Sequence, residues 1–194
     1  VMFMTPVYGE FFESVENWGR KCLTVYLKEE NGYYSVDWEA FENTLKRKPP
    51  IFILCNPHNP VGRCWTREEL KRMGDLCIQY GTLIVSDEIH SDLMLFGNKH
   101  IPMPTVSEEI AANTIACTSA TKTFNLAGLQ AATIVFPNDE LIEKYQKFWK
   151  SMDVHRNNSF STVAVIAAFR EGEEWLEQLL AHLESNVMYV EKYL

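Results

Sequence analysis

The chain has 194 residues, of which 46% are hydrophobic and 23% charged, and its formal net charge is −8. These values are ordinary for a globular domain and allow one substantial core. The negative charge argues against a protein that binds nucleic acid, because such binding needs a basic surface. The longest apolar runs are too short to span a bilayer, so we expect no membrane partner.

Cysteine usage and the start of the sequence bear on the compartment. The five cysteines are odd in number and form no Cys-x-x-Cys pair, which is typical of reduced thiols in a cytosolic protein. The sequence begins at Val1 with neither an initiator methionine nor a signal-peptide pattern. We therefore predict a cytoplasmic protein.

Helical and extended patterns alternate from the start of the chain. Apolar residues at helical spacing predict a helix near residues 9–18; they are Phe11, Val15 and Trp18. A strand is expected over residues 22–27. Asp37 is then placed to cap a helix. The apolar face of that helix carries Trp38, Phe41 and Leu45.

Four short apolar runs in the middle of the chain predict strands, over residues 51–55, 82–86, 114–117 and 131–136. Between the first two, Thr66 and Glu69 form a possible capping box for a helix that Gly81 can end. Short continuous apolar runs separated by helices are typical of a parallel sheet covered on both faces. We therefore predict an α/β fold with a mostly parallel sheet flanked by helices.

The last part of the sequence is helical. A helix is expected near residues 138–151, a polar break at 155–158, and another helix around Val163 and Ile166. A long amphipathic helix then runs from Glu173 to the end of the sequence. Its apolar positions are Leu176, Leu179, Leu183, Val187, Val190 and Leu194. We interpret it as a linker helix and divide the chain into a main part, 1–155, and helices leading toward a further domain, 156–194.

The first three of the four middle strands are each followed by a polar residue of a different kind. They deliver Asn59, Asp87 and Lys122, in that order. Each residue alone has an ordinary explanation: a proline-rich turn, a helix N-cap and a solvated surface charge. Together they matter because ligands collect at the carboxyl ends of strands in open α/β sheets. An amine that forms an imine, an acid that holds a pyridinium and an amide that reaches a phenolic oxygen suit pyridoxal 5′-phosphate.

The segments around these residues resemble fold type I pyridoxal-phosphate enzymes of the aminotransferase class I and II superfamily. The resemblance is closest to their cystathionine (cysteine-S-conjugate) β-lyase branch. It is carried by Ser-x-x-Lys-x-Phe-Asn at 119–125, Asp-Glu-Ile-His at 87–90, Asn-Pro-His-Asn-Pro-Val-Gly at 56–62 and Thr-Pro-Val-Tyr at 5–8. It covers nearly the whole chain but only about half of a family member, and implies the central part of the cofactor-binding large domain.

The resemblance assigns roles to seven residues. It implies that Lys122 is the catalytic Schiff-base lysine and the base that takes the proton from the substrate Cα. The implied cofactor contacts are Tyr8 on the ring face, Asn59 and His90 near the 3′-oxygen, Asp87 at the pyridine nitrogen, and Ser119 with Thr121 around the phosphate. Asp87, His90 and Asp92 lie close in sequence, but no second cluster completes a metal site.

The implied activity is a β-lyase that cleaves cystathionine or S-substituted cysteines to a thiol, pyruvate and ammonia. The implied partners are a small amino-acid substrate and a second copy of the chain. An aminotransferase is the alternative, although Gln130 stands where such enzymes usually place an arginine that binds the phosphate. Two other readings are a non-catalytic fragment or a protein-binding regulatory module. A Ser-x-x-Lys also occurs in acyl-transfer enzymes, but their further motifs are missing here.

Overall fold

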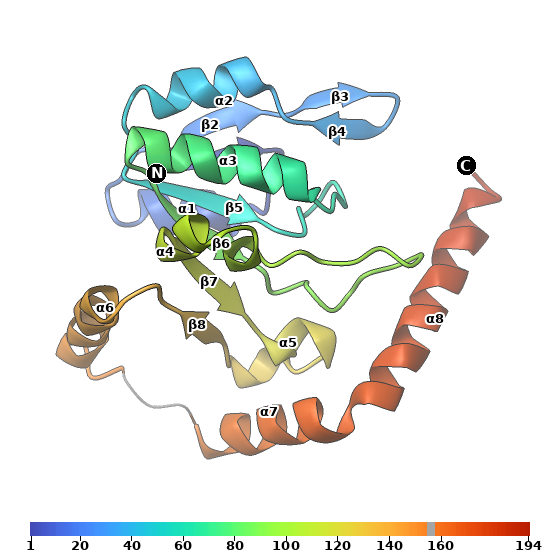
Figure 1. The fold of residues 1–194 in the computed structure, drawn as a ribbon. Helices are drawn as coiled ribbons and strands as arrows, with labels where there is room; N and C mark the ends of the chain where they lie inside the picture. The colour runs from blue at the N-terminus through green and yellow to red at the C-terminus, as the bar shows by residue number, and fades with distance from the viewer. Residues whose placement is uncertain (155–157) are drawn as a thin grey trace.

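The computed structural model describes residues 1–154 and 158–194 (Figure 1). Its centre is a six-stranded sheet with the order β2-β1-β5-β6-β7-β8. The strands are β1 (Met2–Thr5), β2 (Leu23–Tyr26), β5 (Ile51–Cys55), β6 (Leu83–Asp87), β7 (Thr114–Thr118) and β8 (Thr133–Val135). Neighbouring strands are parallel except β7 and β8, which are antiparallel. The mostly parallel α/β sheet predicted from the sequence is confirmed.

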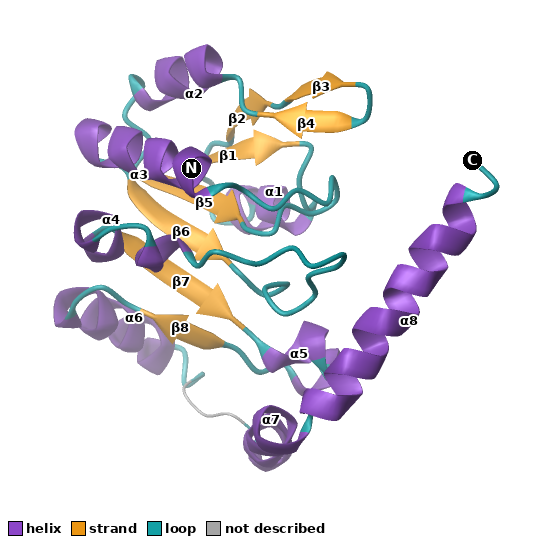
Figure 2. Cartoon of the chain, turned by 45° about the vertical axis from the view of Figure 1, so that its right-hand side comes forward, coloured by secondary structure: helices purple, strands orange, loops and turns teal. Residues whose placement is uncertain are grey.

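Eight helices accompany the sheet in the described part of the chain. They are α1 (Glu10–Glu16), α2 (Trp38–Leu45), α3 (Arg67–Tyr80), α4 (Glu108–Ala112), α5 (Ala120–Thr123), α6 (Asp139–Ser151), α7 (Ser159–Glu171) and α8 (Glu173–Glu191). A two-stranded hairpin, β3 (Lys28–Glu30) and β4 (Tyr33–Ser35), extends beyond β2 (Figure 2). Two short 3-10 turns complete the fold, η1 (Met103–Thr105) and η2 (Ala127–Leu129).

Side chains alternate between two cores, one on each face of the sheet. In β1, Met2 and Met4 join the larger core, which is closed by α2, α3 and α4, whereas Phe3 joins a smaller core under α1. In β5, Leu54 faces the larger core and Cys55 the smaller one. This two-residue period follows from strand geometry. It explains why β1 and β5 are apolar on both faces: each face is covered by one of the cores.

The helix ends expected from the sequence are present. The Asp37 side chain accepts a hydrogen bond from the Ala40 amide at the start of α2. Thr66 and Glu69 form a complete capping box at the start of α3, and Gly81 ends this helix in the left-handed conformation at φ 69°. These caps fix where the chain re-enters the sheet.

Some expectations about the elements need correction. The first helix ends at Glu16, and Trp18 lies beyond it with 61% of its surface exposed. Trp18 therefore does not extend the buried face of α1, and instead packs edge-on against Phe148 of α6, with ring centroids 5.6 Å apart. Asp87 is the last residue of β6 rather than the residue after it.

The C-terminal helices lie beside the sheet and then leave it. Helix α7 packs against α5 and α8, and α8 points away from the sheet with the chain end at its tip (Figures 1 and 2). The expected boundary between residues 155 and 156 falls outside the described residues, so the division into two parts stays a prediction. No described helix has both the length and the apolar content needed to cross a membrane. All five cysteines are free.

Candidate functional site

The order of the strands defines where a ligand site is expected. From β1 the chain moves outward to β2, and it then returns to place β5, β6 and β7 on the other side of β1. The direction of the sheet order therefore changes between β1 and β5. In open α/β sheets, ligands bind outside the carboxyl ends of the strands at such a switch point.

A cavity lies at this carboxyl edge. Five residues singled out in the sequence line it: Tyr8, Asn59, Asp87, His90 and Lys122. They come from the carboxyl ends of four different strands, or from the segments that follow them, and lie far apart in the sequence. The predicted meeting of an amine, an acid and an amide at one edge of the sheet is thus present in the structure.

Lys122 reaches the cavity from α5, the single helical turn that follows β7. Its side chain is exposed and forms no ion pair with any described carboxylate. Asp87 and His90 both experience its positive charge. An amine that is accessible and not committed to a carboxylate is available for chemistry in the cavity.

Asp87 lines the cavity and lies in the same row of the sheet as Cys55 and Cys117. Burial raises the pKa of its carboxyl, and the Ile89 amide, 3.3 Å from Oδ1, opposes this rise in pKa by hydrogen bonding. Burial also raises the pKa of both thiols, to about 12 for Cys55 and to about 11 for Cys117. Asp87 is therefore a partly desolvated acid between two neutral thiols, and a cationic partner would stabilise its charged form.

Asn59 is held by its own main chain. Its amide donates to the sulfur of Cys55 at 3.4 Å, and the Cys55 thiol donates to the carbonyl of Pro57 at 3.3 Å. Asn56, in the same turn, is committed elsewhere, because its side chain donates to the Ile101 carbonyl at 3.0 Å. The turn is therefore organised from within, and the Asn59 side chain is left to line the cavity.

His90 and Tyr8 also line the cavity, His90 from the segment after β6 and Tyr8 from the segment after β1. Burial lowers the pKa of His90, although the nearby Asp87 opposes the effect. The imidazole is therefore a neutral hydrogen-bonding group near pH 7. Tyr8 is 43% exposed and makes an edge contact with Phe11, with ring centroids 6.2 Å apart.

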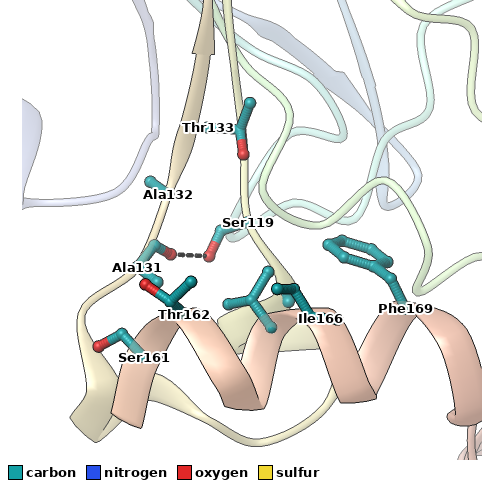
Figure 3. A pocket seen from close by; sticks show the side chains of 10 residues that line it. Ser119, Ala131, Ala132, Thr133, Ser161, Thr162, Ile166 and Phe169 are labelled. Atoms are coloured by element: carbon teal, nitrogen blue, oxygen red, sulfur yellow. Dashed lines mark hydrogen bonds between the residues drawn. The ribbon is translucent and has the colours of Figure 1, made fainter. Parts of the chain in front are cut away.

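Ser119 and Thr121 do not line this cavity in the described structure. The Ser119 hydroxyl lies 2.7 Å from that of Thr121 and donates to the Ala131 carbonyl at 2.6 Å. Ser119 instead lines a neighbouring pocket between the start of β8 and α7, with Thr162 and Ile166 on the far side (Figure 3). Their assignment to a phosphate stays a prediction.

Two lining residues were not identified from the sequence. Cys55 and Ile89 complete the wall of the cavity. Cys55 is the register partner of Asp87 in the neighbouring strand, and Ile89 lies in the turn that follows β6. Gln130 is exposed at the end of η2 and lines neither pocket. No group of three or more His, Cys, Asp or Glu side chains among the described residues could hold a metal ion.

The fold and the cavity define an α/β domain with a lysine, an acid and an amide gathered at the carboxyl edge of its sheet. The family model for aminotransferase class I and II matches residues 1–194. The chain belongs to this family, as the sequence motifs indicated.

Two curated relatives match nearly the whole of this chain. Cystathionine beta-lyase PatB of Bacillus subtilis is 44% identical over 200 residues, covering 100% of this chain and 50% of the relative. Protein MalY of Escherichia coli is 32% identical, covering 98% of this chain and 48% of the relative. The chain thus spans about half the length of the curated relatives it matches.

Solved structures agree with this fold. A pyridoxal-phosphate-bound putative aminotransferase from Clostridium difficile superposes with a TM-score of 0.96 at 47% identity, over 99% of this chain and 50% of that one. Cystalysin from Treponema denticola, which contains pyridoxal 5′-phosphate, also gives 0.96, at 30% identity over 99% of this chain and 49% of that one. The large-domain fold expected from the sequence is confirmed.

Proposed function

We propose that this chain forms the cofactor site of a pyridoxal-phosphate-dependent carbon–sulfur β-lyase. Its substrates would be cystathionine or other S-substituted cysteines, and its products a thiol, pyruvate and ammonia. One observation carries the proposal: Lys122, Asp87 and Asn59 line a single cavity with Tyr8 and His90. The name of PatB, a cystathionine beta-lyase, supports the choice of lyase.

The side chains around the cavity fit pyridoxal phosphate by their chemistry. Bound there, the cofactor would supply an aldehyde that condenses with amines and a pyridine ring that draws electron density from the substrate Cα. Asp87, whose pKa burial raises, would gain a cationic partner in a protonated ring nitrogen. Asn59 and neutral His90 would bind the phenolic oxygen, and Tyr8 would cover one face of the ring.

Lys122 would act twice at its Nζ atom. As an amine it would hold the cofactor aldehyde before the substrate arrives. Once released, the neutral amine would take the proton from the substrate Cα, and the carbon–sulfur bond at Cβ would then break with departure of the thiolate. Its exposure in the cavity, without an ion-pair partner among the described carboxylates, supports this double use.

The first test is Lys122→Ala in the protein that carries this sequence. We expect loss of the visible absorbance of the bound cofactor and a fall in lyase rate of at least about a thousandfold, as for removal of a covalent catalyst. The matched control is Lys144→Ala, because Lys144 is an exposed lysine on α6 that pairs only with Glu140 among the described carboxylates. A Lys122→Ala protein with normal colour and activity would refute the assignment.

Transamination with the same cofactor is the second candidate. It is favoured by the description of the Clostridium difficile structure as a putative aminotransferase, and disfavoured by Gln130, which is not the phosphate-binding arginine of such enzymes. Incubation with cystathionine separates the two. Pyruvate with ammonia indicates elimination, whereas a keto acid without ammonia indicates amino transfer.

The remaining proposals concern the state of the protein. We infer from the family resemblance a homodimer in the cytoplasm, to be tested by analytical ultracentrifugation and by cell fractionation. A protein-binding regulatory role is compatible with the same fold. It would become the preferred function if the protein bound no pyridoxal phosphate in an absorbance titration.

A further inference from the structure

At the switch point, the main-chain pairing between β1 and β5 is short. Strands β1 and β5 pair only through Met2 with Phe52 and Phe3 with Ile53. In contrast, β5 and β6 stay paired up to Cys55 and Asp87. The segments that carry Tyr8 and Asn59 therefore leave the sheet without a main-chain ladder between them.

His58 bridges this gap. Its ring is 1% exposed, and its Nε2 atom lies 2.9 Å from the carbonyl oxygen of Pro6. A carbonyl only accepts hydrogen bonds, so Nε2 carries the hydrogen and donates it. The contact joins residues 52 positions apart. It connects the residue next to Asn59 with the residue two positions before Tyr8.

The main chain and the ring of His58 are themselves held in place by other contacts. The His58 amide donates to the Arg63 carbonyl at 2.8 Å, and the His58 carbonyl accepts from the Gly62 amide at 2.9 Å. The ring also packs edge-on against Trp65, with centroids 5.4 Å apart. With its main chain and ring both fixed, His58 can set the position of Pro6 rather than follow it.

The other ring nitrogen, Nδ1, makes no competing hydrogen bond among the described residues. This atom is also buried. Burial lowers the pKa of the imidazole; the nearby main chain of Pro6 and Cys55 opposes this shift, and the charge of Arg63 adds to it. The side chain therefore remains neutral near pH 7, with its one donor committed to Pro6. It does not line the cavity of Lys122, so its effect there must pass through Tyr8 and Asn59.

We propose that His58 is a positioning residue that holds Tyr8 and Asn59 at a fixed separation in the cavity, so that Tyr8 can cover a face of the cofactor ring while Asn59 reaches its phenolic oxygen. The inference rests on the proposed pyridoxal-phosphate function. Nothing in the reaction chemistry requires a histidine here, because its role is mechanical. Burying Nδ1 without a hydrogen-bond partner costs stability. The positioning role gives a reason why a histidine is nevertheless present at this place.

The test measures the dissociation constant of pyridoxal phosphate by absorbance titration. His58→Phe keeps a ring against Trp65 but removes the hydrogen bond to Pro6. We expect it to weaken cofactor binding about three- to tenfold, the range of one hydrogen bond. His58→Gln places an amide N–H near the position of Nε2, and should restore affinity to within about twofold.

The control is a buried hydrogen bond of the same kind far from the cavity. Thr82 is fully buried at the start of β6, and its hydroxyl donates to the Pro49 carbonyl at 2.8 Å. Thr82→Val should lower the urea midpoint as His58→Phe does, because both lose one buried donor. It should leave cofactor affinity unchanged.

A double-mutant cycle shows whether His58 acts through Tyr8. If it does, His58→Phe should cost much less affinity in a Tyr8→Ala background than in the wild type. Additive losses, or a His58→Phe protein that binds cofactor as the wild type does, would overturn the positioning role. If His58→Phe does not fold, a His58→Gln protein that folds but has lost cofactor affinity overturns it as well. A wild-type protein without cofactor binding would instead refute the proposed function, and this inference with it.

Discussion

In the proposed function, Asp87 would bind the cofactor at a cost in stability. Burial is the main reason that the pKa of its carboxyl is raised in the folded protein without cofactor. Its raised pKa means that ionisation is less favourable in the folded state than in the unfolded chain, so at neutral pH the charge opposes folding. The same desolvation makes the site favourable for a cationic ring, because the partner offsets the cost of burying the charge.

Asp87→Asn should therefore have opposite effects on stability and on binding. Without cofactor, the neutral amide should raise the urea midpoint at pH 7, because no buried charge has to form. Cofactor affinity should fall by about tenfold or more, since a charge-assisted hydrogen bond is lost. Chemical denaturation without cofactor and an absorbance titration measure the two effects. A variant that is less stable than the wild type without cofactor would contradict this account of the site.

At the scale of the element, α3 begins with a group of side chains that does more than cap the helix. Thr66 accepts from the Glu69 amide at 3.2 Å, and a Glu69 carboxylate oxygen accepts from the Thr66 amide at 2.8 Å. Glu69 also accepts from Arg63 at 2.9 and 2.7 Å through its two oxygens. Arg63 in turn accepts the His58 amide with its carbonyl. The helix start is thereby linked to the turn that carries Asn59.

Two substitutions separate these roles. Thr66→Ala should cost about 1 kcal/mol of stability, the typical loss of an N-cap side chain. Glu69→Ala should cost about 2 kcal/mol or more, because it also leaves the mostly buried Arg63 without its carboxylate partner. Urea denaturation measures both. Equal losses for the two variants would mean that the ion pair between Arg63 and Glu69 contributes nothing to stability.

The elements also show where the sequence was informative. The strands β5, β6 and β7 are continuous apolar runs between clear breaks, so both they and the polar residues after them could be predicted. Strand β1 was missed because its four residues are too few to show an alternation of apolar and polar side chains. It is defined instead by its pairing with β2 and β5. The hairpin was missed because Lys28–Glu30 is exposed and charged. Pairing partners far along the chain decide such segments.

The site could be predicted to a similar degree. The residue types after three strands indicated Asn59, Asp87 and Lys122, since the direction of a parallel strand fixes which edge they reach. The side-chain direction within a turn is not fixed in this way. The Ser119 hydroxyl therefore bonds to Ala131 beside a second pocket, and the hydrogen bond from His58 to Pro6 could not be foreseen, because it depends on the three-dimensional meeting of two loops.

On the scale of the whole molecule, three buried or half-buried ionisable groups near the switch point make stability depend on pH. Burial lowers the pKa of His58 and of His90. In the unfolded chain these imidazoles bind protons below about pH 6.5. The unfolded state then holds more protons than the folded state, so the free energy of unfolding falls as the pH drops below about 6.5. The raised pKa of Asp87 acts in the opposite direction, over the range between the ordinary carboxyl pKa and its raised value.

We therefore expect the protein without cofactor to be less stable at pH 5.5 than at pH 7.5. His58→Gln keeps a donor for Pro6 and removes one of the two titrating imidazoles, so it should reduce this difference without abolishing it. Thr82→Val should lower stability by the same amount at both pH values, because a hydroxyl does not titrate. Urea denaturation at the two pH values measures all three proteins. A His58→Gln protein with the same pH dependence as the wild type would show that His58 already binds a proton in the folded state, contrary to its buried, neutral tautomer.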